Sequence, residues 1–334
     1  MEIQTPYLLF LGDAPDALAA KVAMGIKQWH PEYCVGQYRM DTCQADCQLP
    51  DLDIAAAKAA GAKTLVIGVA NRGGIISPAW IDVLKQALHA GLDLAAGLHN
   101  RLNAIDELVD LAKSLGRQMF DVRFPTQTFS VASGKRRKGK RVLPVGTDCS
   151  VGKMYTALAI TEVLHQRGLK ATFRATGQTG ILVSGAGVSV DSVVSDFISG
   201  AVEELAPAND ADHWDVIEGQ GSLFHPSFAG VTTGLIHGAQ ADALVLCHEP
   251  TRTHMRGTPE FALPDLKTCM ALNLTMAHLT NPAAKFVGIS INTSQLAESD
   301  AYTLMATLEK EHNLPVVDPF RQGVERIVDQ MLAL

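Results

Sequence analysis

The sequence predicts an α/β protein with two successive parallel, doubly wound sheets. Short apolar runs alternate with stretches of helical periodicity along the whole chain, and this alternation is typical of βαβ units. The loops that follow the apolar runs are dense in Gly, Asp, Thr and His. A chain of 334 residues has room for about two domains.

The first third of the chain contains one complete set of alternating elements. Strands are expected at 7–13, at 63–74, where the strand runs into a loop, and at 93–98. Helices are expected at 16–29, 78–91 and 105–116. We therefore predict an N-terminal Rossmann-like domain over residues 1–132.

A basic segment, SGKRRKGKR at 133–141, follows this domain. We interpret it as a solvated linker between domains. A second interpretation, compatible with the first, makes it a positive rim that attracts an anionic cofactor.

The remainder, 142–334, repeats the alternating pattern. Its expected strands are 141–145, 170–174, 214–218, 242–247 and 285–291. Ligands of open α/β sheets bind beyond the carboxyl ends of the strands. The residues directly after each strand are therefore the candidates for function.

Composition and charge exclude several functions. The net charge of −7 does not suit a nucleic-acid binder, and no apolar run has the length of a membrane span. The N-terminus lacks the basic region of a signal peptide. The six cysteines are scattered, so we expect reduced thiols in a cytoplasmic protein, with a zinc site at Cys43 and Cys47 as a poorer second choice.

The stretch GTDCSVGKMYT, residues 146–156, carries the strongest chemical signal. It lies between an expected strand and an expected helix, where successive backbone N–H groups form an anion cradle and Lys153 adds a positive charge. This makes the second domain P-loop NTPase-like, and the spacing of the loop resembles that of dethiobiotin synthetase and its relatives. The expected cofactor-binding residues of the loop are Gly146, Thr147, Asp148, Cys149, Ser150, Val151, Gly152, Lys153 and Met154.

Met154 stands where a nucleotide hydrolase has the Ser or Thr that binds magnesium. A thioether does not replace a hard oxygen ligand. Thr156 lies two residues on, so a helix turns it away from that position. The loop is thus suited to hold a pyrophosphate as a handle, as in coenzyme A, and we expect no metal.

Three acid–base candidates follow strands of the second domain. Glu218 ends one strand and occupies the place of a Walker B carboxylate. Asp196 lies in a stretch expected to be helical and capped by Asp191, and His225 precedes a proline in a loop. We expect Glu218 to be the general base, with Asp196 and His225 as its rivals.

Polar side chains at other strand ends are candidates for binding the substrate. Arg252 and Arg256 are four residues apart, which suits two carboxylates if the segment is helical. Asn292 follows the last strand and is placed to bind adenine. His248 and His254 have no metal-site partner at convincing spacing. The remaining candidates lie in glycine-rich turns, where the backbone approaches a ligand closely: Asn71, Arg72, Gln178 and Thr179.

Taken together, these motifs resemble the D-glutamate N-acetyltransferase family. The stretches that carry the resemblance are NRGG, VGTDCSVGKMYTAL, RATGQTGILVSG, DSVVSDFISGAVE, EGQGSLFHPSFAGVTTGLIHG and CHEPTRTHMRG. They cover both domains, and Met154 agrees with the family pattern. The resemblance implies transfer of an acetyl group from acetyl-CoA to the amino group of D-glutamate, as a first step in its catabolism.

The expected partner is therefore a small acidic amino acid, and a homo-oligomer is expected for an enzyme of this size. A covalent acetyl-Cys149 is a second route, because a thiol at a helix N-terminus has a lowered pKa. Two other functions remain as alternatives: an ATP-dependent ligase or carboxylase, and a nucleotide-binding module without chemistry.

Overall fold

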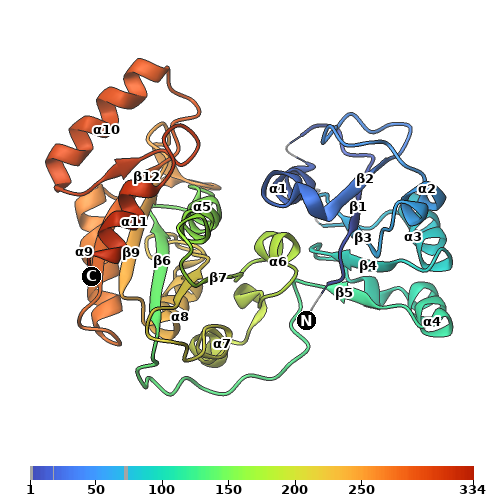
Figure 1. Cartoon of the computed structure of the whole chain (residues 1–334), viewed down its shortest axis with the longest axis horizontal. Coiled ribbons are helices and arrows are strands. Elements are labelled where there is room, and N and C mark those ends of the chain that lie inside the picture. Colours follow the sequence, from blue (N-terminus) through green and yellow to red (C-terminus); the bar gives the residue numbers. More distant parts are fainter. Residues whose placement is uncertain (1–2, 18, 71–73) are drawn as a thin grey trace. The chain divides into compact units, whose positions relative to one another are not determined.

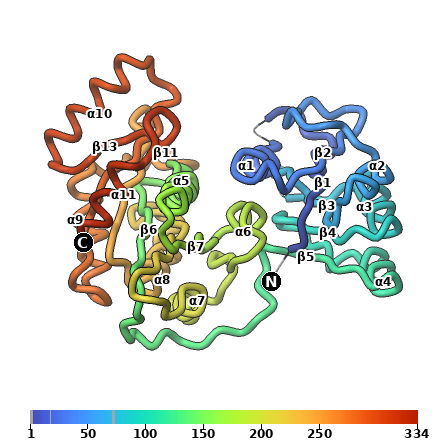
Figure 2. Tube along the Cα trace, in the orientation of Figure 1, coloured from blue at the N-terminus to red at the C-terminus, as the bar shows by residue number. Residues whose placement is uncertain are grey.

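The computed structural model describes residues 3–17, 19–70 and 74–334. The chain folds into two compact units (Figure 1). The first unit consists of Met1–Thr126 and Gly177–Ser192, and the second of Gln127–Thr176 and Val193–Leu334. The chain therefore leaves the first unit, returns to it for one short segment and leaves it again (Figure 2).

The first unit is built on a parallel sheet of five strands in the order β2-β1-β3-β4-β5. This order is one of the two common arrangements of doubly wound folds. β1 is buried at all of its six positions, as expected for a strand covered on both faces. The strands are β1 (Tyr7–Gly12), β2 (Cys34–Arg39), β3 (Thr64–Ile67), β4 (Asp93–Ala96) and β5 (Met119–Asp121).

Two helices of the first unit, α2 and α3, begin with a polar side chain that caps the first turn. Asp53 accepts a hydrogen bond from the Ala56 N–H, and Ser77 accepts one from the Trp80 N–H before Pro78 starts the helix. The helices are α1 (Lys21–Trp29), η1 (Pro31–Tyr33), α2 (Ile54–Ala59), α3 (Pro78–His89), η2 (Leu102–Ala104), α4 (Asp106–Leu115), α6 (Gln178–Ser184) and η3 (Val190–Ser192).

The second unit is built on a parallel sheet of six strands in the order β13-β12-β9-β6-β8-β7. β6 lies between β8 and β9, so the loop that follows β6 is flanked by the carboxyl ends of both neighbours. The strands are β6 (Lys140–Gly146), β7 (Ala171–Arg174), β8 (Trp214–Ile217), β9 (Ala243–His248), β12 (Lys285–Ile291) and β13 (Val316–Val317). A separate antiparallel hairpin joins β10 (His254–Met255) to β11 (Thr258–Ala262).

The helices of the second unit share one apolar core with this sheet. In that core, Ile160 and Leu164 of the helix after β6 pack with Val245 of β9 and Ile327 of the last helix. The helices are α5 (Lys153–Gln166), η4 (Ser195–Phe197), α7 (Ile198–Leu205), α8 (Ala229–Ala239), α9 (Leu266–His278), α10 (Glu298–His312) and α11 (Glu325–Leu332). None of the helices in the described ranges is both long and apolar enough to cross a membrane.

The predicted α/β fold with two parallel sheets is confirmed, and strands β2, β5 and β13 were missed from the sequence for two reasons. β2, with the sequence CVGQYR, is half-buried at most of its positions and carries Gly36 and Gln37 inside it, so its apolar signal is weak. β5 and β13 have only three and two residues. The helix expected to begin at SVVSDF begins only at Ile198.

Asp191 does not cap that helix. Its carboxylate accepts a hydrogen bond from the Ser189 hydroxyl at 2.7 Å and pairs with Arg123 at 2.7 Å. Asp191 and Arg123 both belong to the first unit, so the segment that ends at Ser192 is tied to that unit.

The basic segment 133–141 is neither fully solvated nor close to the anion loop. Arg136 and Arg137 donate to the Gln240 and Gly238 carbonyl oxygens at the end of α8, at 3.0 and 2.6 Å. The Arg141 side chain is fully buried. These residues precede or begin β6, so they lie at the amino end of the strand whose carboxyl end bears the loop. Cations near the last turn of α8 complement its dipole.

Candidate active site

The loop 146–152 connects β6 to α5 at the carboxyl edge of the second sheet. A Cβ at Gly146 would lie 2.8 Å from Val151 Cγ2 and 3.1 Å from Lys153 Nζ, because the loop folds back over this residue. Gly152 has a φ of +99° and leads directly into the helix, a conformation that L side chains rarely adopt. The expected strand–loop–helix arrangement is confirmed.

A buried carboxylate holds the loop in place. Asp148 Oδ1 accepts the N–H of Cys149 at 2.6 Å, and Oδ2 accepts the Arg256 backbone N–H at 2.8 Å. The Arg252 guanidinium completes the set at 2.7 Å from Oδ2. Burying this charge is tolerated because it is paired and hydrogen-bonded. The Asp148 carboxylate therefore stabilises the conformation of the loop.

Lys153 is buried at the start of α5. Its ammonium donates to the Asp148 carbonyl oxygen at 2.7 Å, within the curve of the loop. Burial lowers the pKa of Lys153, and the nearby Cys149 and Cys247 raise it again in part. An anion bound in the loop would favour the charged lysine, so the site is built to gain a negative ligand.

In α5, the position after Lys153 carries no hydroxyl that could bind magnesium, because Met154 occupies it. Met154 is half-buried at the position after Lys153. The Thr156 hydroxyl is fully buried, donates to the Gly152 carbonyl oxygen at 3.0 Å and lies 2.7 Å from Ser290 Oγ of β12. The prediction that Thr156 points away from the phosphate side is confirmed.

Glu218 lies directly after β8 and is buried. Its Oε2 accepts the Thr176 N–H at 2.8 Å, and the Thr176 hydroxyl donates to the Glu218 carbonyl oxygen at 2.6 Å. Next to it, a Cβ at Gly219 would lie 1.8 Å from the Pro144 carbonyl oxygen and 3.0 Å from Lys153 Cδ. The residue directly after Glu218 therefore adjoins both the loop strand and the stem of Lys153.

His225 is buried beside the loop, and both of its ring nitrogens are engaged. Nδ1 accepts the Ser227 N–H at 3.1 Å, which makes Nε2 the protonated nitrogen, and Nε2 donates to the Arg256 carbonyl oxygen at 3.0 Å. A general base needs a free lone pair. In this arrangement His225 positions the loop that carries Arg256.

Asp148, Cys149 and His225 form a cluster in which one potential ligand atom of each lies within 4.8 Å of the others. The carboxylate is paired with Arg252 and the imidazole is fully hydrogen-bonded, so neither offers a lone pair to a cation without losing those bonds. Burial raises the pKa of Cys149, against the opposing effect of Lys153. The expectation of a lowered thiol pKa is therefore wrong, because desolvation outweighs the nearby positive charges.

All six cysteines are free thiols. Within the described ranges, Cys43 and Cys47 belong to no group of three potential metal ligands. The zinc site considered as a second choice for these two residues therefore has no support in the structure.

The carboxyl end of β9 contributes a histidine that sequence reasoning did not select. His248 Nδ1 lies 3.0 Å from the Thr147 hydroxyl of the loop, and burial lowers the pKa of His248 from 6.5 to about 4. Its carbonyl oxygen accepts the Asn292 N–H at 2.9 Å. The available signal was its position at the end of a buried strand that neighbours the loop strand.

Arg252 and Arg256 converge on the loop without a helix. The segment between them contains the short strand β10. Arg252 donates to the carbonyl oxygens of Cys149 and Ser150, at 2.7 and 3.3 Å, and pairs with Glu249. The exposed Arg256 guanidinium contacts the Ser150 hydroxyl. The prediction that Arg252 and Arg256 share one face of a helix is therefore wrong, although both side chains do contact the loop.

No described contact joins Asp196, Gln178 or Thr179 to this cluster. Asp196 is exposed on η4. Gln178 and Thr179 belong to the first unit, where Gln178 packs near Gly97 and Thr179 near Gly25. Asn71 and Arg72 lie outside the described residues.

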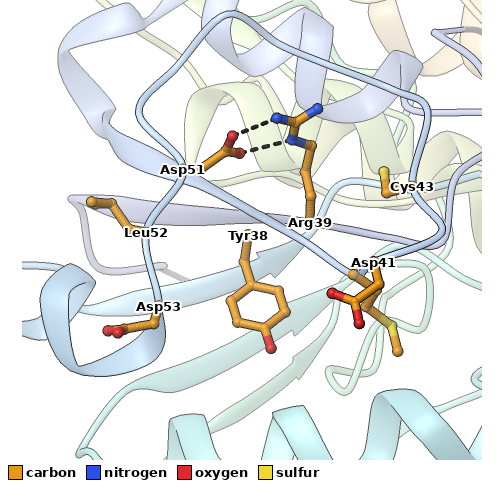
Figure 3. Close-up of a pocket in the computed structure, with 8 residues that line it drawn as sticks. Tyr38, Arg39, Asp41, Cys43, Asp51, Leu52 and Asp53 are labelled. Carbon is orange, nitrogen blue, oxygen red and sulfur yellow. Dashed lines mark hydrogen bonds and ion pairs between the residues drawn. The ribbon is translucent and has the colours of Figure 1, made fainter.

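A cavity of about 480 Å³ opens in the first unit, beyond the end of β2 (Figure 3). Its lining includes Arg39, which pairs with Asp51, and two further acids, Asp41 and Asp53. The excess of carboxylates disfavours an anionic ligand. The anion loop of the second unit is therefore the better candidate for an acidic substrate or a nucleotide.

Two family models match the chain, one after the other. The model of a domain of unknown function, the DUF1611 C-terminal P-loop domain, matches residues 130–328. The model of the DUF1611 N-terminal Rossmann-like domain matches residues 32–125. The crystal structure of a DUF1611 family protein from Anabaena variabilis is similar with a TM-score of 0.87 at 32% identity, and the match covers 99% of this chain and 100% of that one.

Two curated relatives match along the whole chain. A protein of Tritonibacter scottomollicae named D-glutamate N-acetyltransferase is 56% identical over 99% of this chain and 100% of its own length. A protein of a Pseudoalteromonas species with the same name is 46% identical over 98% of this chain and 99% of its own length. The chain therefore belongs to the DUF1611 family and, within it, to the D-glutamate N-acetyltransferases that it resembles from end to end.

Proposed function

We propose that this protein transfers the acetyl group of acetyl-CoA to the amino group of D-glutamate. The observation that carries the proposal is the loop 146–152, an anion cradle with a buried lysine whose magnesium-binding hydroxyl is replaced by Met154. Such a cradle suits a diphosphate that is held and not cleaved. The full-length relatives supply the reaction and the substrate.

In this proposal the pyrophosphate of coenzyme A binds the loop amides of residues 146–152. The Lys153 ammonium lies 2.7 Å from the Asp148 carbonyl oxygen and is released to the phosphate when the donor binds. No metal takes part in this binding.

Acetyl transfer needs a neutral amine in front of the thioester carbonyl carbon. The amine nitrogen forms a bond to that carbon, the carbon–sulfur bond breaks, and the coenzyme A thiolate leaves and takes up a proton. Glu218 is the candidate that removes the proton from the substrate ammonium. Its rivals are weaker, because Asp196 is exposed on η4 and both nitrogens of His225 are hydrogen-bonded.

The pantetheine arm restricts this assignment. It is comparable in length to about four extended residues, so it spans about 14 Å from pyrophosphate to sulfur when extended. Glu218 adjoins the loop through Gly219 and Lys153. Catalysis by Glu218 therefore requires an arm that folds back over the loop.

Replacing Glu218 by Gln tests this requirement. We expect kcat to fall at least a hundredfold while the affinity for coenzyme A stays within about twofold, since general bases contribute about 10²–10⁴ to rate. Steady-state kinetics and calorimetric titration with coenzyme A separate the two quantities. A variant with normal kcat and weakened coenzyme A binding would make Glu218 part of the cradle.

The substrate carboxylates are expected to bind cationic and polar side chains. Of the two arginines near the loop, Arg256 is the better candidate for binding a substrate carboxylate, because the Arg252 guanidinium is already paired with Asp148. An arginine suits a carboxylate because its guanidinium donates two parallel hydrogen bonds.

The function is tested by incubating the protein with acetyl-CoA and a panel of D- and L-amino acids and following the release of free thiol. Thiol release with D-glutamate above all other amino acids is the expected result. Magnesium-dependent consumption of ATP, with no affinity for coenzyme A, would contradict the proposal and favour a ligase.

We further propose that the protein acts in the cytoplasm, in the catabolism of D-amino acids, and that it forms a homo-oligomer.

A further inference from the structure

An exposed aromatic side chain stands beside the helix that follows the anion loop. Phe320 exposes 64% of its surface. Its ring packs against Tyr155, with the ring centroids 5.2 Å apart at an angle of 49°. Tyr155 lies in the first turn of α5, two residues after Lys153, so the pair is close to the loop in the same unit.

The loop that carries Phe320 is firmly anchored. The buried Asp318 accepts the Phe320 N–H on Oδ1 and the Thr293 N–H on Oδ2, both at 2.9 Å. Arg321 donates to the Thr293 hydroxyl at 2.8 Å. These bonds join the segments after β12 and β13, so the exposed ring is presented at little cost in conformational entropy.

Asn292 lies at the same edge of the sheet. β12 and β13 are neighbours with Ser290 opposite Val317, so Asn292 and Phe320 each follow the carboxyl end of their strand. Asn292 Oδ1 accepts the Ser294 N–H at 3.1 Å. The Asn292 side-chain NH₂ has no hydrogen-bond partner in the described part of the chain, and is left as a donor.

We propose that Phe320, supported by Tyr155, is the platform on which the adenine ring of coenzyme A stacks, with the Asn292 amide donating to a ring nitrogen. The proposal rests on the proposed function, which puts the pyrophosphate on the loop. A helix rises about 1.5 Å per residue, so Tyr155 lies about 3 Å along α5 from Lys153. In this proposal a ribose separates the adenine on Phe320 from the phosphates on the loop.

Adenine fits this platform because stacking on an aromatic side chain needs a flat π-face, which every nucleobase has. The alternative occupant of an exposed phenylalanine is a second copy of the chain. That occupant would make Phe320 important for assembly and irrelevant to the nucleotide.

The first experiment measures binding of 3′-phospho-ADP, the nucleotide half of coenzyme A, by calorimetry. We expect Phe320→Ala to raise Kd about tenfold and Phe320→Trp to retain the wild-type Kd, since stacking accounts for differences of this size. Leu279→Ala is the matched control, because Leu279 is also exposed, at 68%, but lies at the end of α9 before the amino end of β12.

The second experiment compares acetyl-CoA with S-acetyl-pantetheine, which lacks the nucleotide. Phe320→Ala should raise KM for acetyl-CoA about tenfold, leave KM for S-acetyl-pantetheine unchanged, and leave kcat unchanged with both donors. These selective changes are not expected if Phe320 merely supports the fold.

An unchanged Kd for 3′-phospho-ADP in Phe320→Ala would overturn the proposal. A smaller sedimenting species in the same variant, with unchanged Kd, would assign Phe320 to a contact between copies. Failure of the proposed function is distinguishable from both outcomes, because wild-type protein would then release no thiol from acetyl-CoA with any amino acid.

Discussion

Two arginines beside the loop have different environments, and this difference decides what each side chain does. Arg252 pairs with Asp148, which is fully buried, and is itself only 17% exposed. Arg256 is exposed, and its guanidinium contacts Ser150. Removing the partner of a buried charge is costly, whereas truncating an exposed side chain changes stability little.

We predict that Arg252→Ala lowers the free energy of unfolding by about 3 kcal/mol. Arg256→Ala should change it by less than about 0.5 kcal/mol and raise KM for D-glutamate about tenfold. Urea unfolding and steady-state kinetics on the two variants check both statements. Equal stability of the two variants would show that Asp148 does not depend on Arg252.

His248 provides a prediction about acid stability. Burial lowers the pKa of His248 from 6.5 to about 4, so the unfolded chain takes up this proton at a higher pH than the folded protein. The contribution of His248 to stability is therefore complete above pH 6.5 and is lost as the pH falls towards 4.

Relative to His248→Gln, we expect the wild-type protein to lose about 3 kcal/mol of unfolding free energy between pH 7 and pH 4. Unfolding by urea at several pH values measures the difference. Parallel pH profiles for the two proteins would mean that His248 has its ordinary pKa in the folded state.

At the scale of elements, the site depends on the close approach of two strand ends. Gly219 follows β8 and lies against the Pro144 carbonyl oxygen of β6, beside the stem of Lys153. The EGQG turn thus fixes the distance between the loop strand and the strand that carries Glu218. Neighbouring parallel strands bring such turns to one edge of the sheet, and this is why the topology could be used to select Glu218.

We predict that Gly219→Ala lowers the unfolding free energy by about 3 kcal/mol and weakens coenzyme A binding at least tenfold, because its Cβ would clash with backbone. Gly230→Ala in α8 is the control, since a Cβ there meets nothing within 4 Å and should stabilise by up to about 1 kcal/mol. Thermal unfolding and calorimetry measure both effects. Normal coenzyme A binding by Gly219→Ala would show that the strand spacing is not critical.

At the scale of the whole molecule, the chain connects its two units three times. Residues 177–192 return to the first unit, where α6 contacts α1 and the Gly185 carbonyl oxygen accepts the Ile3 N–H at 3.1 Å. The first unit is therefore incomplete when it ends at Thr126.

We predict that a fragment of residues 1–126 unfolds with a lower midpoint than the same fragment joined to residues 177–192 by a glycine–serine linker. The reason is the apolar surface of α1 that α6 covers, since buried apolar area stabilises by about 25 cal/mol per Å². Thermal unfolding followed by circular dichroism compares the two fragments. Identical midpoints would mean that α6 contributes nothing to the first unit.

The sequence by itself determined the fold class and the strand–loop–helix arrangement of residues 146–156, and it selected Glu218 as a candidate base. Periodicity is a local property, and strand–loop–helix motifs such as 146–156 are contiguous in the chain, so both are visible without coordinates. The same locality explains why β2, with its internal Gly36 and Gln37, gave no signal. The linker arginines were misinterpreted because their partners, at the end of α8, are about 100 residues away.

Only the tertiary structure decided which side chains remain available for chemistry. It showed that Arg252 is committed to Asp148, that His225 has no free nitrogen, and that desolvation raises the pKa of Cys149. It also brought Phe320 to Tyr155, which is 165 positions earlier in the chain. Hydrogen-bond partners and burial depend on contacts between distant segments, and these contacts exist only after the sheet has formed.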